Sequence, residues 1–349
     1  MDIEEIKLKV DEIIKSINGV VLGYEREVKL LLTCLLANGH VLFEGVPGVA
    51  KTTLVKALVK LLGLYQYKKQ INGIVYKGFS RIQFTPDLMP SDITGSLIYD
   101  PSTRQFEPRL GPIFSYIVLA DEINRAVPRT QSALLQAMQE KEVTIGNRTY
   151  PLELRDKDKF FFVLATQNPV EQEATYPLPE AQLDRFLMRI IIGYPPTLEV
   201  EKNIYRLHMD RLTEPFEDLE KIVDPSWIIK VQEFIAEKVK VSNDALEYTT
   251  ILIRNTRPQI FEPVSEYFEL GASPRAGIAL IRAAKAHAVI SRGVEEVERV
   301  DIDSVLFPVL NHRLIPNFEK LVDLESRGER FLARYKLLEE GIKYIKENI

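Results

Sequence analysis

The chain contains the ten-residue stretch Glu44-Gly45-Val46-Pro47-Gly48-Val49-Ala50-Lys51-Thr52-Thr53. A short apolar run before it, Val41-Leu42-Phe43, predicts a buried strand, and residues 54–62 after it are apolar at helical spacing. A strand, a glycine-rich turn and a helix in this order form the context in which a phosphate-binding loop occurs. In such a loop, backbone N–H groups converge on an anion at the positive end of the helix dipole. The stretch therefore predicts a site for a phosphate-bearing ligand.

Two side chains of this stretch have the chemistry that a nucleotide requires. We expect Lys51 to contact the β- and γ-phosphates and the Thr52 hydroxyl to ligate Mg²⁺. Ala50 stands where the pattern G-x-x-x-x-G-K-[ST] has its second glycine. Because a methyl group is tolerated there only at negative φ, we expect a negative φ at Ala50. The alternative is a plain strand-turn-helix crossover with a solvated lysine.

The composition limits the class of protein. Of the 349 residues, 46% are hydrophobic and 27% are charged, which is typical of a globular protein, and the length suggests two domains. The net charge of −5 argues against a surface that coats nucleic acid, although a local basic channel stays open as an alternative. The single cysteine, Cys34, lies in an apolar segment and is expected to fill space in the core.

Neither a membrane span nor a metal site built from protein ligands alone is expected. No apolar run reaches the roughly 18 residues that cross a bilayer, and residues 1–5 carry no signal-peptide pattern. We therefore expect a cytoplasmic protein. The four histidines are scattered, and none is paired with another histidine or a cysteine at ligand spacing.

Two helices are predicted before the phosphate loop. An isoleucine and valine stripe at helical spacing ends at Asn18-Gly19, and a second helix is expected from Tyr24 to Ala37. Between them lies a short apolar bend that includes Val21 and Leu22. This bend could form a wall for an adenine base, or it could simply pack against the sheet.

The strand predicted at residues 115–120 is apolar throughout and ends in two acids, Asp121 and Glu122. A strand without polar alternation belongs in the middle of a parallel sheet, where both faces are buried. Ligands of open α/β sheets bind at the carboxyl ends of such strands. We expect Asp121 to hold Mg²⁺ through its water shell and Glu122 to polarise the attacking water. The alternative is a strand end that exposes two acids without function.

A third buried strand, residues 160–166, is followed by Gln167-Asn168-Pro169. The Asn168 amide could orient a water molecule beside Glu122, or Asn168-Pro169 could be a turn. Two hairpins are also expected, one with strands at 97–99 and 104–107 and one over residues 141–150. Residues 65–80 are polar, contain two glycines and are expected to form a loop.

A domain boundary is expected at Tyr194-Pro195-Pro196, directly after the last predicted strand. Residues 1–195 would form the α/β domain with its parallel sheet, and residues 196–349 would form a helical domain. Within the latter, Ser273 is expected to be the N-cap of a helix that has Pro274 in its first turn. Arg275 in that first turn opposes the helix dipole. Either an anion such as a nucleotide phosphate lies nearby, or the arginine pairs with a carboxylate.

These motifs together resemble those of the AAA+ ATPases and, within them, the MoxR family in the helix-2-insert branch. In that family an alanine before the Walker A lysine is normal. The matching segments are 45–52 (Walker A), 81–95 (helix-2 signature), 119–126 (Walker B), 165–169 (sensor 1), 178–186 (arginine-finger segment) and 271–276 (sensor 2).

The resemblance implies a three-layer αβα AAA+ domain with a helix-2 insert and a presensor-1 hairpin, followed by an all-α lid domain that carries sensor 2. It also implies ATP and Mg²⁺ as cofactors. The implied nucleotide contacts are Val21, Leu22, Gly45, Val46, Pro47, Gly48, Val49, Ala50, Lys51, Thr52, Thr53 and Asp121, with Thr52 and Asp121 at the Mg²⁺. The implied catalytic residues are Glu122, Asn168, Arg185 and Arg275.

The function that the resemblance implies is Mg²⁺-dependent ATP hydrolysis that drives chaperone-like remodelling or maturation of a partner protein. The implied assembly is a homo-oligomeric ring, a hexamer, in which Arg185 reaches the γ-phosphate of the neighbouring subunit. Arg275 would contact nucleotide in cis or in trans. Family members often act with a protein that bears a von Willebrand factor A domain, and a protein client is implied as well.

The chain departs from the family pattern in three places. Tyr24 stands where relatives often carry glutamine, residues 257–270 are longer than usual, and the carboxyl-terminal helices match weakly. Two other functions are kept as alternatives. One is a nucleic-acid motor of the related helicase branch, although the acidity of the chain leads us to expect no nucleic-acid partner. The other is a nucleotide-gated scaffold with little turnover.

Overall fold

A six-stranded sheet in the order β10-β1-β9-β6-β3-β2 forms the centre of the α/β domain. The computed structural model describes residues 1–169, 175–326 and 332–349. All neighbouring strands of the sheet are parallel except β2 and β3, which are antiparallel. The strands are β1 (Val41–Gly45), β2 (Lys68–Ile71), β3 (Ile74–Gln83), β6 (Ser115–Asp121), β9 (Phe162–Gln167) and β10 (Met188–Ile192).

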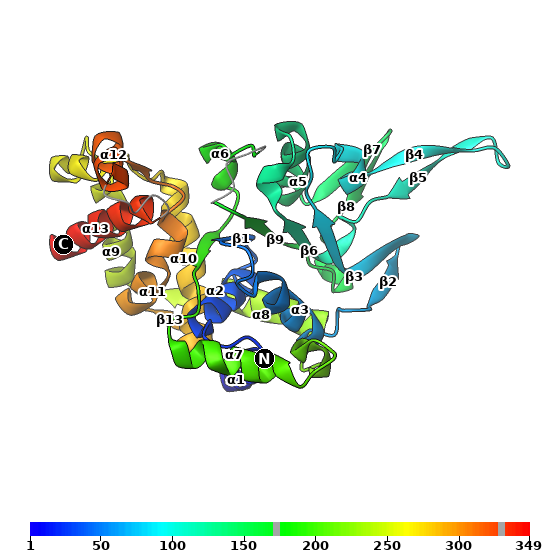
Figure 1. The fold of residues 1–349 in the computed structure, drawn as a ribbon, viewed down its shortest axis with the longest axis horizontal. Helices are drawn as coiled ribbons and strands as arrows, with labels where there is room; N and C mark the ends of the chain where they lie inside the picture. Colours follow the sequence, from blue (N-terminus) through cyan, green and yellow to red (C-terminus); the bar gives the residue numbers. More distant parts are fainter. Residues whose placement is uncertain (170–174, 327–331) are drawn as a thin grey trace.

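Helices cover both faces of this sheet, which confirms the predicted three-layer α/β architecture (Figure 1). Every residue of β1 and β6 is buried, as their continuous apolar sequences predict. Figure 1 shows α1, α2 and α3 on one side of the sheet and α4 and α5 on the other. These helices, together with the short α6, are α1 (Ile3–Asn18), α2 (Glu25–Leu36), α3 (Lys51–Leu61), α4 (Pro90–Thr94), α5 (Pro128–Glu140) and α6 (Glu180–Leu183).

The prediction of a loop over residues 65–80 is wrong, because β2 and the first part of β3 form a hairpin there. Its turn is Asn72-Gly73, and both residues have positive φ, 50° and 82°. Asn-Gly with positive φ at both positions is the preferred two-residue turn between antiparallel strands. The dipeptide was therefore a signal for the hairpin. The polar flanks concealed it, because β2 is the edge strand of the sheet and only one of its residues is buried.

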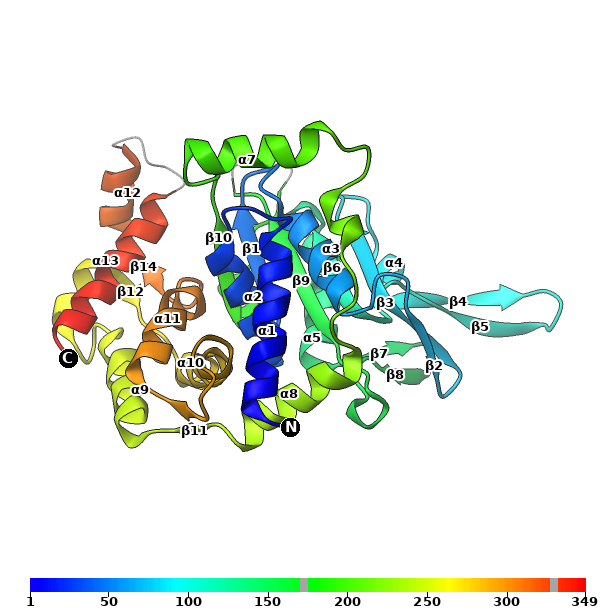
Figure 2. The same cartoon turned by 90° about the horizontal axis from the view of Figure 1, so that it is seen from below.

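The two other hairpins are found where the sequence predicts them. They are β4 (Gly95–Asp100) with β5 (Gln105–Leu110), and β7 (Glu142–Ile145) with β8 (Arg148–Pro151). The β4–β5 hairpin extends away from the rest of the molecule, on the side opposite to the carboxyl-terminal helices (Figures 1 and 2). Near its tip the rings of Tyr99 and Phe106 lie 5.4 Å apart, and both side chains are exposed.

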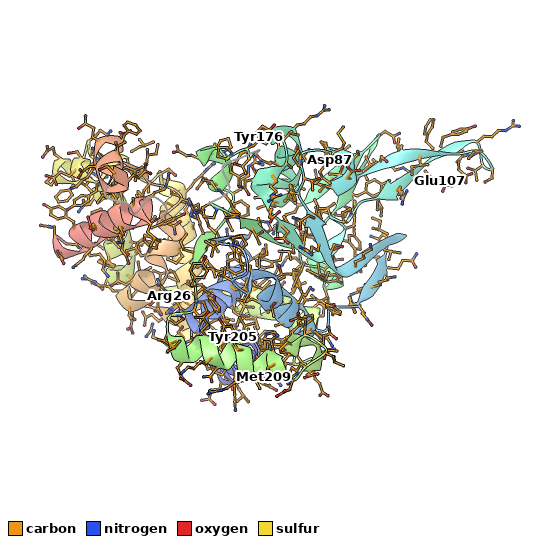
Figure 3. All side chains as sticks on the ribbon, viewed as in Figure 1. Arg26, Asp87, Glu107, Tyr176, Tyr205 and Met209 are labelled. Carbon is orange, nitrogen blue, oxygen red and sulfur yellow. The ribbon has the colours of Figure 1, made fainter. Side chains whose placement is uncertain are left out.

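The chain after β10 first covers the α/β domain and then builds the lid. Helix α7 (Leu198–Met209) carries Tyr205 and Met209 on its outer side (Figure 3). The next turn, Pro215–Asp218, buries Phe216, and the chain then pairs with the end of α3 through Ile222 N–H and Leu61 O (2.8 Å). The remaining helices are α8 (Pro225–Glu237), α9 (Asn243–Asn255), α10 (Pro274–His287), α11 (Arg299–Leu310), α12 (Phe318–Ser326) and α13 (Ala333–Glu347).

The lid is helical, as expected, with short strands only in its loops. Two short two-stranded sheets close its loops, β11 (Lys240–Val241) with β13 (Glu296–Val297) and β12 (Phe268–Leu270) with β14 (Ile315–Pro316). Segments of two or three residues are too short to give a recognisable strand pattern. No helix among the described residues is both long enough and apolar enough to cross a membrane.

The carboxyl-terminal helix α13 is attached to the central sheet through a buried polar cluster. The Tyr335 hydroxyl donates to the Glu44 carboxylate and receives a hydrogen bond from Arg189. Arg189 of β10 forms an ion pair with Glu44 of β1 at 2.6 Å. All three side chains are buried. Because Glu44 directly precedes the phosphate loop, this cluster connects α13 to the strand that carries the loop.

His40 is one of two histidines that are buried and neutral. Its Nδ1 accepts the Val163 N–H at 3.0 Å, and its Nε2 donates to the Met138 carbonyl at 3.2 Å. Burial lowers the pKa of His40 from 6.5 to about 3. Burial also lowers the pKa of His312 well below 6.5. Folding therefore requires both imidazoles to stay unprotonated in mildly acidic solution.

This requirement predicts acid destabilisation. Below pH 6.5 the unfolded chain protonates His40 and the folded chain does not, so stability falls as the pH decreases toward 3. From about pH 7 to about pH 5, His40 should account for a loss of about 2 kcal/mol in the free energy of unfolding. In urea unfolding, His40→Gln should reduce the pH-dependent loss by that amount, whereas His208→Gln, at an exposed position, should leave it unchanged. An unchanged loss in His40→Gln would contradict this prediction.

Candidate functional site

The motifs predicted to bind nucleotide meet at one edge of the sheet. Strand β9 lies between β1 and β6, with Glu44 opposite Gln167 and Ala120 opposite Ala165. The phosphate loop after β1, Asn168 after β9 and the acid pair after β6 therefore follow three neighbouring parallel strands. The structure brings these sequence-predicted residues together at the carboxyl edge, where open α/β sheets bind ligands.

The phosphate loop has the backbone conformation of an anion cradle. Gly48 has φ +81°, and a Cβ added there would meet no atom within 4 Å, so the space in front of its backbone is open. Gly45 cannot be replaced without a shift, because its Cβ would lie 2.2 Å from the Ile192 carbonyl oxygen. The Lys51 ammonium donates to the carbonyls of Gly45 (2.5 Å) and Val46 (3.2 Å). The open cradle, this lysine and Thr52 in the first turn of α3 fit a phosphate group with its Mg²⁺.

The expectation of a negative φ at Ala50 is wrong. Ala50 has φ 51° and ψ 9°, the left-handed conformation, and it is the N-cap of α3. The chain must turn sharply at this point so that the Lys51 N–H and those after it face the loop. Alanine adopts this conformation at a cost of about 1 kcal/mol or more. The second glycine of the usual pattern would avoid this cost.

The acid pair is held by neighbouring side chains. One Asp121 oxygen accepts from Arg81 Nε (3.0 Å) and Nη2 (2.5 Å), and the other accepts from the Thr166 hydroxyl (2.6 Å). The Thr166 oxygen in turn accepts the Glu122 N–H at 2.8 Å. Glu122 has φ 56°, which is uncommon for a residue other than glycine and is found mostly where the surrounding structure enforces it.

Besides Thr166, three residues that were not predicted as site residues contact these acids. Arg81 binds Asp121, while Gln83 Nε2 donates to Glu122 at 2.7 Å and Arg125 Nε lies 3.1 Å from the same carboxylate oxygen. Arg81 and Gln83 stand two apart on β3 and therefore project from the same face of the strand. Their alternation was visible in the sequence. The pairing of β3 with β6, which places both side chains next to the acid pair, was not visible there.

The apolar bend before α2 packs beside the carboxyl end of β10. Val21 is buried, and the Tyr24 hydroxyl donates to the Gly193 carbonyl at 3.1 Å. A Cβ at Gly23 would lie 2.6 Å from Val200 of α7. Packing, one of the two alternatives for this bend, is thus observed. An adenine contact by Val21 and Leu22 stays a prediction.

The two predicted catalytic arginines lie in a different place from the phosphate loop. Arg185 and Arg275 line one cleft of about 500 Å³, together with Asp184 and with His40, which precedes β1. This cleft is at the amino end of β1, whereas the phosphate loop is at its carboxyl end. The five residues of β1 separate the two ends by about 16 Å.

Arg275 is 83% exposed and lies 3.9 Å from the Asp184 carboxylate. Of the two alternatives for Arg275, the structure therefore contains the pair with a carboxylate, at a long distance. Ser273 occupies the N-cap position of α10 as predicted, but its side chain makes no capping hydrogen bond. The Arg185 guanidinium makes no hydrogen bond or ion pair with any residue that the structure describes. Both arginines thus present their charge to the cleft.

Comparisons with known proteins agree with this geometry. Residues 40–188 match the model of the ATPase family associated with various cellular activities (AAA), and residues 262–330 match the AAA lid domain. The chain is 39% identical over 317 residues to Chaperone MoxR1 of Mycobacterium tuberculosis, which covers 90% of this chain and 78% of that one. It is 43% identical over 290 residues to the uncharacterized protein YeaC of Bacillus subtilis, covering 82% and 81% of the two chains.

A structural comparison gives the same result over nearly the whole chain. The crystal structure of a candidate ATPase from Cytophaga hutchinsonii superposes with a TM-score of 0.82 at 38% sequence identity. The match covers 99% of this chain and 96% of that one. The similarity therefore extends over the α/β domain and the lid together.

The left-handed alanine of the phosphate loop yields a stability prediction. Ala50→Gly should relieve the strain at φ 51°, and the gain should exceed the added flexibility of the unfolded chain, for a net stabilisation of up to about 1 kcal/mol. Gly48→Ala, at φ +81° with free space around its Cβ, is the matched control and should destabilise by about 1 kcal/mol. Urea unfolding without nucleotide measures both. A loss of stability in Ala50→Gly would show that the alanine is not strained.

Proposed function

Because the chain belongs to the MoxR family of AAA+ ATPases, we propose that it couples Mg²⁺-dependent ATP hydrolysis to chaperone-like remodelling or maturation of a partner protein. The observation that carries this proposal is the meeting of phosphate loop, acid pair and Asn168 at the ends of three adjacent parallel strands. Hydrolysis of a phosphoanhydride is mostly positioning and charge stabilisation, and these groups supply both.

Each residue of this edge has a role in the proposal. Lys51 and the loop amides bind the β- and γ-phosphates, with Thr52 and Asp121 at the Mg²⁺. Bound Mg²⁺ would neutralise charge between the phosphates. Glu122 accepts a proton from the attacking water, and Asn168 orients that water. The further nucleotide contacts that we propose are Val21, Leu22, Gly45, Val46, Pro47, Gly48, Val49, Ala50 and Thr53.

Arg185 and Arg275 complete the site of a neighbouring subunit in this proposal. Both line the cleft at the amino end of β1, whereas the phosphate loop of their own chain follows the carboxyl end of that strand, which is about 16 Å long. A head-to-tail arrangement of subunits would place them at the next phosphate loop. Such an arrangement closes as a ring, and we propose a homohexamer. Both arginines then act in trans, Arg185 as the finger, with an effect of roughly 10³–10⁵ on the rate.

The partner side of the proposal rests on the family and on one exposed element. One relative carries the name chaperone, and we propose a protein client, a partner with a von Willebrand factor A domain, and a cytoplasmic site of action. The β4–β5 hairpin extends from the molecule with exposed Tyr99 and Phe106, which suits contact with a polypeptide. A nucleic-acid motor is disfavoured by the net charge of −5. Salt-sensitive stimulation of the ATPase by DNA would favour it instead.

Mixing two inactive variants tests the shared site. Arg185→Ala keeps its phosphate loop and Lys51→Ala keeps its finger, so an equimolar mixture should regain activity that neither has alone. Random assembly gives about one quarter of the sites an intact loop beside an intact finger. We expect about one quarter of the wild-type ATPase rate per subunit. For wild type, the rate per subunit should rise with protein concentration.

The controls separate assembly from catalysis. Arg148→Ala changes an exposed arginine on the β7–β8 hairpin. By itself this variant should hydrolyse ATP at the wild-type rate. Mixed with Lys51→Ala, it should give no more than the average of the two separate rates. If the mixture of Arg185→Ala with Lys51→Ala stays inactive although both variants assemble, the trans-acting finger is refuted and a monomeric switch or scaffold becomes the better description.

Glu122→Gln distinguishes an ATPase from a nucleotide-gated scaffold. Removing the base should lower the ATPase rate by about 100-fold or more, while the affinity for a fluorescent ATP analogue stays within about twofold, because Glu122 contacts water and not phosphate. Glu140→Gln, at an exposed position of α5, is the matched control. Wild-type behaviour of Glu122→Gln would support the scaffold.

A further inference from the structure

We propose that the lid residue Arg313, assisted by Asn311 and His312, positions the arginine finger Arg185. The three residues follow α11 and contact the backbone of residues 184–189, which leads from α6 into β10. This inference rests on the proposed role of Arg185 in trans. The lid would thus position Arg185, a residue that lines the cleft.

Arg313 makes the main contacts. Its Nε donates to the Asp184 carboxylate at 2.7 Å. Its two terminal nitrogens donate to the carbonyls of Asp184 (3.3 Å), Phe186 (2.7 Å) and Leu187 (3.2 Å). The side chain is only 5% exposed. One guanidinium thus fixes both residues that flank Arg185.

The two preceding residues extend this contact along the same segment. Asn311 Nδ2 donates to the Arg189 carbonyl at 2.9 Å, and His312 Nε2 donates to the Phe186 carbonyl at 3.1 Å. Both side chains are buried. The lid therefore supplies hydrogen-bond donors to the carbonyls of residues 184, 186, 187 and 189. A buried carbonyl left without a donor is costly, so the path of this segment depends on the lid.

The segment has little rigidity of its own. Helix α6 has four residues, about one turn, and isolated turns are unstable. The Phe186 N–H bonds the Leu183 carbonyl at 3.0 Å, and the Leu187 N–H bonds the His40 carbonyl at 2.8 Å. Within the α6 turn the Arg185 N–H also bonds the Gln182 carbonyl, at 3.2 Å, so local bonds hold the N–H groups of this segment and Arg313 holds its carbonyls. The Arg185 side chain bonds no described residue, so its direction follows from the backbone that Arg313 holds.

Asp184 links the two lid arginines, Arg275 and Arg313. One of its oxygens pairs with Arg313 and the other lies 3.9 Å from Arg275. Arg275 and Arg313 both belong to the lid, and Arg185 follows Asp184 in the chain. Arg185 and the lid arginines Arg275 and Arg313 are therefore connected through Asp184.

The test compares Arg313→Met with Arg185→Ala in the full-length chain. Misplacing a catalytic group by about 1 Å costs about 100-fold, so Arg313→Met alone should lose about 100-fold or more of the ATPase rate. Its own phosphate loop is intact, so its affinity for a fluorescent ATP analogue should stay within about twofold. An equimolar mixture with Lys51→Ala should recover about one quarter of the wild-type rate per subunit.

The recovery in the mixture is a result that general destabilisation cannot produce. Arg292→Met is the matched control, because Arg292 forms a similar fork to Asp301 within the lid (3.1 and 2.5 Å) and does not line the cleft. Any loss in that variant should not be recovered with Lys51→Ala. If Arg313→Met does not fold, Asp184→Asn replaces it, with an expected loss of about 10-fold and the same recovery.

The outcomes separate this inference from the proposed function. If Arg185→Ala complements Lys51→Ala but a folded Arg313→Met does not, or if Arg313→Met and Asp184→Asn hydrolyse ATP at the wild-type rate, the positioning role of Arg313 is refuted and the shared site stands. If Arg185→Ala itself fails to complement, the trans finger is refuted, and the positioning role falls with it.

Discussion

The parallel pairing of β9 between β1 and β6 is the constraint on which the nucleotide site depends. Parallel strands end at the same edge, so this pairing places three segments that are far apart in sequence next to one another. The order of strands also brings β3 beside β6, and Arg81 of β3 then binds Asp121. Because β9 lies between them, Asn168 follows the strand that separates the phosphate loop from the acid that we propose for Mg²⁺.

The same sheet separates the two halves of the proposed catalytic machinery. The phosphate loop lies at the carboxyl end of β1, and the arginine cleft lies at the amino end. One chain therefore carries both parts but cannot join them, which makes assembly a physical requirement for the proposed activity. Because Arg313 makes buried contacts with residues 184–187, the α/β domain and the lid form the cleft together. The cluster of Glu44, Arg189 and Tyr335 connects α13 to the carboxyl end of β1.

At two positions the backbone conformation differs from the one that the residue type alone favours. Ala50 and Glu122 both take left-handed backbone conformations, with φ near 51° and 56°, although neither is glycine. For Ala50 the local steric rule led to a wrong expectation, because the turn into α3 is set by the strand before it and the helix after it. Strain of this kind is found where the surrounding structure determines the conformation more strongly than the residue itself.

The sequence by itself determined the class of fold, the positions of the buried strands, the phosphate loop and the acid pair. It could do so because these features depend on local patterns: a continuous apolar run for a central strand, glycines for a cradle, and acids at a strand end. Only the tertiary structure decided that Arg81 reaches Asp121 and that Arg313 holds residues 184–187. These contacts join residues distant in sequence, 129 positions apart for Arg313 and Asp184. No local pattern encodes such a distance, because it follows from the strand order and the docking of the lid.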